Sequence, residues 1–93
     1  MLILIKNGPD TPEGKRGLQL ALDMCADICL LQNAVYFAQK ERLEGVCGKV
    51  YVLEEDKRLR GLNADEMEKD ILPLDYDGLV DIMDSADKVA GIF

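Results

Sequence analysis

Asp27-Ile-Cys-Leu-Leu-Gln-Asn-Ala-Val-Tyr-Phe-Ala38 is the stretch of this 93-residue sequence that decides the fold. Its apolar run Ile28 to Leu31 is too short for a helix, and an aromatic-rich pattern typical of a helix follows the polar pair Gln32-Asn33. A strand that is apolar at every position is covered on both faces, as in parallel α/β sheets. The stretch therefore predicts a buried strand that leads into a helix with Asn33 at its N-cap.

The residues on either side of this stretch continue the alternation of strands and helices. Thr11 and Pro12 have the residue types of a helix start, and Asp75 has the same role before the helix that carries Leu79, Val80 and Met83. In the first helix the apolar stripe, at i, i+3, i+4 and i+7, consists of Leu18, Ala21, Leu22 and Cys25. We expect the other strands at residues 1–6, 49–53, 71–74 and 88–93.

This alternation predicts an α/β fold with three layers, α/β/α, and a mostly parallel sheet of about five strands. The chain has no internal linker or repeat, so we expect residues 1–93 to form a single domain. Pro73 cannot donate a hydrogen bond to a neighbouring strand, which places the strand at residues 71–74 at an edge or makes it very short. A chain of this length buries only a modest core, and oligomerisation is therefore expected.

Charge and hydropathy restrict the partners of the protein. The 11 basic and 18 acidic residues give a net charge of −7, which opposes direct binding to a nucleic acid. The opening run Met1-Leu-Ile-Leu-Ile5 is too short for a signal-peptide core, and no apolar run approaches the length that spans a membrane. We therefore expect a cytoplasmic protein without a membrane partner.

The composition also excludes several kinds of catalytic site. The chain contains no histidine and only one serine, Ser85, so it cannot build a Ser-His-Asp or a Cys-His arrangement by itself. The turn Asn7 to Gly14 matches neither a dinucleotide loop nor a phosphate-binding loop, and the acidic residues at 75–81 lack calcium-loop spacing. We therefore expect no metal and no cofactor, and no enzyme activity of the chain on its own.

Three cysteines, an odd number, argue against a disulfide framework, and reduced thiols are the expectation. Cys29 lies inside a strand and should be buried and inert. Cys25, near the end of the first helix, and Cys47, before the third strand, should both lie at the amino end of the sheet. Cys47 lies in a loop flanked by glycines and is the cysteine expected to be exposed.

Polar residues follow the strands at the opposite, carboxyl end of the sheet. Because open α/β sheets place their sites at this end, we take as a candidate binding rim the residues Asn7, Gln32, Asn33, Asp56 and Arg60. Asp56 is also expected to cap a short helix through Leu59, which ends at Arg60-Gly61. Residues 63–66 have the spacing of a capping box.

The ordered set of segments resembles one family. Leu30-Leu-Gln-Asn-Ala-Val-Tyr36, Lys49-Val-Tyr-Val-Leu-Glu-Glu-Asp56, Arg60-Gly-Leu62, Ile71-Leu-Pro-Leu-Asp-Tyr76 and Leu79-Val-Asp81 are similar to the DsrE/DsrF/DsrH family, in its DsrH (TusB) branch. The likeness covers nearly the whole chain.

The resemblance implies a non-catalytic subunit of a cytoplasmic sulfur-relay complex. Such complexes pass sulfur as a cysteine persulfide, toward 2-thiolation of the tRNA wobble uridine or in dissimilatory sulfur oxidation. The implied partners are DsrE/TusD-like and DsrF/TusC-like subunits, with self-association as the other form of assembly.

Two alternatives stay open. The chain could carry persulfide directly through Cys25 or Cys47, which are the candidate sulfur acceptors, because a relay needs an accessible thiol that a partner can reach. It could also be an unrelated α/β protein that binds a small molecule at the carboxyl rim.

Overall fold

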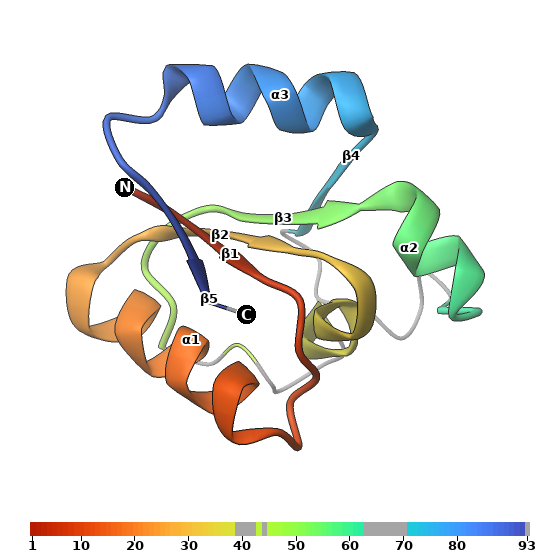
Figure 1. Cartoon of the computed structure of the whole chain (residues 1–93), viewed down its shortest axis with the longest axis horizontal. Coiled ribbons are helices and arrows are strands. Elements are labelled where there is room, and N and C mark those ends of the chain that lie inside the picture. Colours follow the sequence, from red (N-terminus) through yellow and green to blue (C-terminus); the bar gives the residue numbers. More distant parts are fainter. Residues whose placement is uncertain (39–42, 44, 63–70, 93) are drawn as a thin grey trace.

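The computed structural model describes residues 1–38, 43, 45–62 and 71–92. The elements follow one another along the chain as β1 (Leu2–Ile5), α1 (Pro12–Met24), β2 (Asp27–Leu30), the 3-10 helix η1 (Gln32–Ala38), β3 (Val50–Leu53), α2 (Glu54–Leu59), β4 (Ile71–Leu74), α3 (Tyr76–Ser85) and β5 (Val89–Ile92). Figure 1 shows the sheet in the middle, with α1 on one side and α3 on the other. The predicted alternation of strands and helices is confirmed.

The five strands form one sheet in the order β4-β3-β2-β1-β5, and every neighbouring pair is parallel. The predicted parallel sheet in a three-layer α/β fold is therefore confirmed. β4, which contains Pro73, pairs only with β3 and lies at an edge, as the proline predicted. The connection through α3 carries the chain from this edge to the opposite one, where β5 pairs with β1.

Alternate residues of the strands face the two sides of the sheet. Ile3 and Ile5 of β1 point to the side covered by α1 and η1. The main core lies on that side, and its fully buried members from η1 are Ala34, Val35 and Ala38. α1 approaches the sheet closely because Gly17 lies against the Ile5 side chain, where a β-carbon would come to 3.0 Å from it.

The other side of the sheet is covered by α3 and is less completely buried. Leu2, Leu4 and Cys29 form a small cluster there, and Leu79 and Ile82 of α3 pack against it. None of the α3 residues is itself buried. Neighbouring strands lie about 4.8 Å apart, so five of them span about 19 Å, which exceeds the diameter of a single helix of roughly 10 Å. α3 alone therefore covers this face only in part.

Two of the predicted helix starts are confirmed. The Thr11 hydroxyl oxygen accepts the Gly14 N–H at 3.0 Å, and Pro12 occupies the first helical position. The Asp75 carboxylate accepts the Gly78 N–H at 2.7 Å at the start of α3. In both cases the side chain satisfies a backbone donor that the helix leaves free, and the sequence signal is local.

The other two predicted N-caps are wrong. η1 already begins at Gln32, whose φ of +48° turns the chain directly after β2, so Asn33 lies inside the helix. α2 begins at Glu54 with Leu53 at its N-cap, so Asp56 is its third residue. The side chains of Asn33 and Asp56 bond to partners far away in sequence instead of to their own helices.

The predicted end of α2 is confirmed, because Arg60 is its C-cap and Gly61 has a φ of +67°. The helix predicted after Asn33 appears as the 3-10 helix η1 as far as Ala38. Residues 39–42 and 44, which follow it, lie outside the described residues. The capping box predicted at residues 63–66 also lies outside them.

Candidate functional site

Cys25 ends α1 at the amino end of the sheet. Its N–H donates to the carbonyl groups of Ala21 and Leu22, and its φ of +52° lies in the left-handed region. The core-facing position predicted for Cys25 is wrong: the chain turns at this residue, Ala26 occupies the buried place, and Cys25 is exposed. Left-handed backbone is uncommon at a residue other than glycine, and here it accompanies the turn of the chain at Cys25.

Cys47 lies in the loop that leads into β3 and is exposed, as predicted. The loop is held against the segment that follows Cys25. Gly48 touches it so closely that a β-carbon at residue 48 would collide with the Ala26 carbonyl group. The Lys49 N–H donates to the Asp27 carboxylate at 2.8 Å, and the Ile28 N–H donates to the Lys49 carbonyl oxygen at 2.9 Å.

Cys25 and Cys47 are joined by a disulfide, with their Cα atoms 5.3 Å apart. The prediction that both lie at the amino end of the sheet is confirmed, and the expectation of reduced thiols is wrong for this pair. The cause is topological. Cys25 precedes β2 and Cys47 precedes β3, and these two strands are direct neighbours in the sheet. The amino-acid composition alone does not reveal that these two strands are neighbours in the sheet.

Cys29 is fully buried on the side of the sheet that α3 covers, as predicted. Burial, reinforced by the negative charge of Asp56, raises the pKa of its thiol from 9.0 to about 12. Because the thiolate is the nucleophilic form of cysteine, Cys29 is unreactive at neutral pH.

The structure brings together four of the five predicted rim residues at the carboxyl end of the sheet. Asp56 is a buried residue with an exposed fraction of 8%, and its carboxylate accepts the Gln32 N–H at 2.7 Å. The Arg60 guanidinium donates to the Asn33 side-chain oxygen at 3.1 Å and to the Asp56 carbonyl oxygen at 3.3 Å. It also lies 3.8 Å from the Asp56 carboxylate.

Asn7, the fifth rim residue, lies in the turn after β1, beside the start of η1. The turn is tied to η1 because the Ala34 N–H donates to the Lys6 carbonyl oxygen at 3.2 Å. The rim side chains that are brought together bond chiefly to one another and to backbone groups. Small-molecule binding at this rim stays a prediction, which a ligand-dependent rise in melting temperature that is lost in Gln32→Ala would support.

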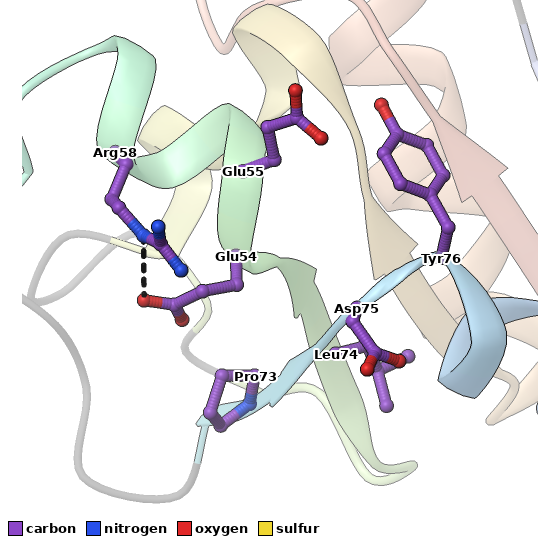
Figure 2. Close-up of a pocket in the computed structure, with 7 residues that line it drawn as sticks. All are labelled: Glu54, Glu55, Arg58, Pro73, Leu74, Asp75 and Tyr76. Carbon is purple, nitrogen blue, oxygen red and sulfur yellow. Dashed lines mark ion pairs between the residues drawn. The ribbon is translucent and has the colours of Figure 1, made fainter.

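A shallow hollow that the sequence did not indicate lies between α2 and the start of α3, as Figure 2 shows. Its lining residues are Glu54, Glu55, Arg58, Pro73, Leu74, Asp75 and Tyr76. Arg58 forms an ion pair with Glu54 at 3.7 Å. The neighbouring Glu55 carboxylate raises the pKa of the Tyr76 hydroxyl. These residues meet because β3 and β4 pair, so the residues that follow the two strands become neighbours.

The hollow is acidic, but it is not a metal centre of the usual kind. Within residues 1–38, 43, 45–62 and 71–92, no group of three or more carboxylates and thiols is arranged to hold a metal ion.

In the same part of the chain, none of the helices has the length and apolar character needed to cross a membrane.

Solved structures with the same fold include proteins from two bacteria. The crystal structure of the ychN protein from E. coli matches with a TM-score of 0.80 and 17% sequence identity, over 97% of each chain. The solution NMR structure of Tm0979 from Thermotoga maritima matches with a TM-score of 0.64 and 22% identity, over 95% of this chain and 97% of the other. At these identities the likeness concerns the fold alone.

Comparison with curated proteins gives no match. The sequence profile described as "DsrH like protein" matches residues 12–89, which include every element from α1 to the start of β5. The fold, the order of the elements and this match agree with the resemblance seen in the sequence. The chain belongs to the DsrH-like protein family.

Proposed function

We propose that this chain is a non-catalytic subunit of a cytoplasmic sulfur-relay complex and assembles with DsrE/TusD-like and DsrF/TusC-like subunits. The complex would deliver persulfide sulfur toward tRNA wobble-uridine 2-thiolation or dissimilatory sulfur oxidation. Membership of the DsrH-like family supports the sulfur-relay assignment. The observation that carries the assembly role is the incompletely covered face of the sheet on the α3 side.

Tyr76, Val80 and Met83 follow one another along α3 at i, i+4 and i+7, and thus form one stripe, which we call the α3 stripe. All three are exposed, with Val80 at 56%. The stripe lies beside the row of Leu79 and Ile82, which packs on the sheet. α3 therefore has a wider apolar surface than its contact with the sheet uses.

The sheet continues this apolar surface on both sides of α3. Leu72 of β4 and Val89 of β5 belong to the strand positions that face α3, and both are exposed, at 44% and 40%. Grouped apolar side chains of this kind mark surfaces that another protein covers. A related α/β subunit packed on α3 would bury them and complete the third layer.

The composition supports a role without catalysis by this chain, because it has no histidine and its buried thiol, Cys29, is held in the neutral form. The exposed positions of Cys25 and Cys47 favour the second candidate, a chain that carries persulfide directly. The two candidates are compatible, since a subunit that assembles through α3 leaves the amino end of the sheet to its partners.

Coexpression of the tagged chain with a DsrE-like and a DsrF-like chain from the same genome tests the assembly role. We expect the three chains to copurify and to elute together in size-exclusion chromatography with light scattering. Val80→Glu places a charge in the α3 stripe and should weaken the association at least tenfold, which corresponds to about 1.4 kcal/mol. A monomer that retains neither partner would refute the proposal.

The matched control is Arg16→Gln, because it also changes the net charge by one negative unit at an exposed helical position, on the opposite side of the sheet. It should leave the association unchanged. Equal melting temperatures of the isolated Val80→Glu and wild-type chains would separate a lost interface from a lost fold. Equal weakening by both variants would contradict a role of the α3 stripe.

A further inference from the structure

We propose that Cys25 and Cys47 form a resolving pair, in which Cys47 accepts a sulfane sulfur atom and Cys25 expels it as hydrogen sulfide. The pairing itself rests on the structure, whereas the choice of sulfane sulfur as the substrate rests on the second candidate under the proposed function, a chain that carries persulfide directly. The site lies at the amino end of the sheet and uses none of the residues of the α3 stripe or of the carboxyl rim.

The backbone brings the two cysteines within reach of each other. Their Cα atoms are 5.3 Å apart, inside the range of about 4.4–6.8 Å that a disulfide requires. The absence of a side chain at Gly48 permits this approach, because the loop rests directly on the Ala26 carbonyl group. The left-handed backbone of Cys25 turns the chain at the same place.

Both cysteines are also accessible. Each is exposed in the folded chain, although they lie in different loops separated by 22 residues. Structural disulfides are commonly shielded, whereas exposed ones are the more easily exchanged. A donor persulfide and a reductant can therefore both reach the pair without unfolding of the core.

The charges along the chain assign the two roles. Cys25 caps the C-terminus of α1, where the helix dipole is negative, and Asp23 lies two residues before it. Cys47 has the exposed Lys49 two residues after it. A thiolate is stabilised by positive charge and disfavoured by negative charge, so Cys47 is the receiving thiol and Cys25 the resolving one.

The reaction balances without a further oxidant. Transfer from a donor persulfide to the Cys47 thiolate breaks the sulfur–sulfur bond of the donor and gives Cys47–S–SH and the donor thiol. The Cys25 thiolate then attacks the inner sulfur of that persulfide, the Cys25–Cys47 bond forms, and the outer sulfur leaves as hydrosulfide. The sulfane sulfur is reduced by two electrons, and the two cysteine sulfurs are each oxidised by one.

A dithiol reductant closes the cycle by thiol–disulfide exchange, because it reduces the Cys25–Cys47 disulfide and is itself oxidised to a disulfide. In the disulfide form Cys29 is the one cysteine with a free thiol, and it is buried. The disulfide form therefore cannot accept a second sulfur atom. The oxidation state of the pair thus decides whether this subunit releases sulfur.

The test uses the full chain, reduced and desalted, with one equivalent of glutathione persulfide. Sulfide is trapped with monobromobimane, and native alkylation followed by intact-protein mass spectrometry reports the thiols. We expect the wild type to release one equivalent of sulfide, to lose the mass of two hydrogen atoms and to resist alkylation at Cys25 and Cys47. Cys25→Ser should instead retain one sulfur atom, removable by dithiothreitol, and release no sulfide. Cys47→Ser should take up no sulfur.

Other outcomes would overturn the proposal. A wild-type protein that keeps the added sulfur and both alkylatable thiols would show that the cysteines do not resolve each other. A glutathione adduct on Cys25→Ser would show attack on the wrong sulfur atom of the donor. Retention of sulfur by Cys47→Ser, with none on Cys25→Ser, would contradict the assigned roles. None of these results changes copurification with partner subunits, so the assembly role is tested separately.

Discussion

At the scale of single residues, Cys29 has a definite effect on stability because burial opposes the ionisation of its thiol in the folded chain. Its folded pKa of about 12 exceeds the ordinary value of 9.0, chiefly because the thiol is buried. Between these two values the unfolded chain has released the proton and the folded chain still binds it. The free energy of unfolding therefore falls as the pH rises above 9.0.

We predict that replacing Cys29 with alanine removes this part of the pH dependence. The difference in slope between the two proteins should approach about 1.4 kcal/mol per pH unit, the value for one proton. Urea denaturation of both proteins at a series of pH values around and above 9.0 measures it. The comparison is made in the Cys25→Ser/Cys47→Ser background, in which disulfide exchange cannot occur. Parallel stability curves would contradict the raised pKa.

At the scale of elements, Asp56 joins α2 to the start of η1. Its carboxylate accepts the Gln32 N–H at the first residue of η1, where the backbone is left-handed. Arg60, one helical turn later, holds the same carboxylate and reaches Asn33. Two short helices that would be marginal alone are thus fixed to each other.

We predict that Asp56→Ala lowers the free energy of unfolding by about 1–3 kcal/mol, because it leaves the Gln32 N–H without its partner. Asp56→Asn retains an acceptor oxygen and should recover part of the loss. The control is Glu55→Ala, on the same helix but exposed, which should change stability by less than about 0.5 kcal/mol. Urea denaturation of the three variants measures this, and an equal effect of Asp56→Ala and Glu55→Ala would contradict the link.

The same elements explain what the sequence could predict. The caps at Thr11 and Asp75 involve donors three residues away, so residue type and spacing were sufficient. Asn33 and Asp56 have equally good capping side chains, but partners 27 and 24 residues away in sequence take them. A helix start is predictable from sequence only where no distant group competes for the capping side chain.

At the scale of the whole molecule, the order of the strands decides which residues meet. The rim was predictable, because the carboxyl ends of parallel strands share one edge whatever their order. The Cys25–Cys47 pair and the hollow beside Tyr76 were not, because they depend on which strands are neighbours. The exposure of the α3 stripe could not be predicted for a similar reason. Val80 and Met83 have the sequence pattern of core residues, and they are exposed because none of the other described elements of the fold covers them.

The disulfide also constrains the whole chain. It joins positions 22 residues apart, and a loop of this size predicts a stabilisation of about 2–4 kcal/mol from the reduced freedom of the unfolded chain. We therefore expect Cys25→Ser/Cys47→Ser to unfold at lower urea concentration than the oxidised wild type, and to match the wild type kept in dithiothreitol. Equal stability of the oxidised protein and the double variant would contradict this expectation.

The position of β5 has a consequence for synthesis on the ribosome. β1 is made before β5, yet one of its edges has no neighbour until translation has reached Ile92. Until then the nascent chain presents the open edge of an apolar strand, which favours pairing with other chains. Pairings between such distant parts of a chain also form slowly. Early protection of this edge, by a chaperone or by a partner chain made alongside it, would raise the yield of folded protein.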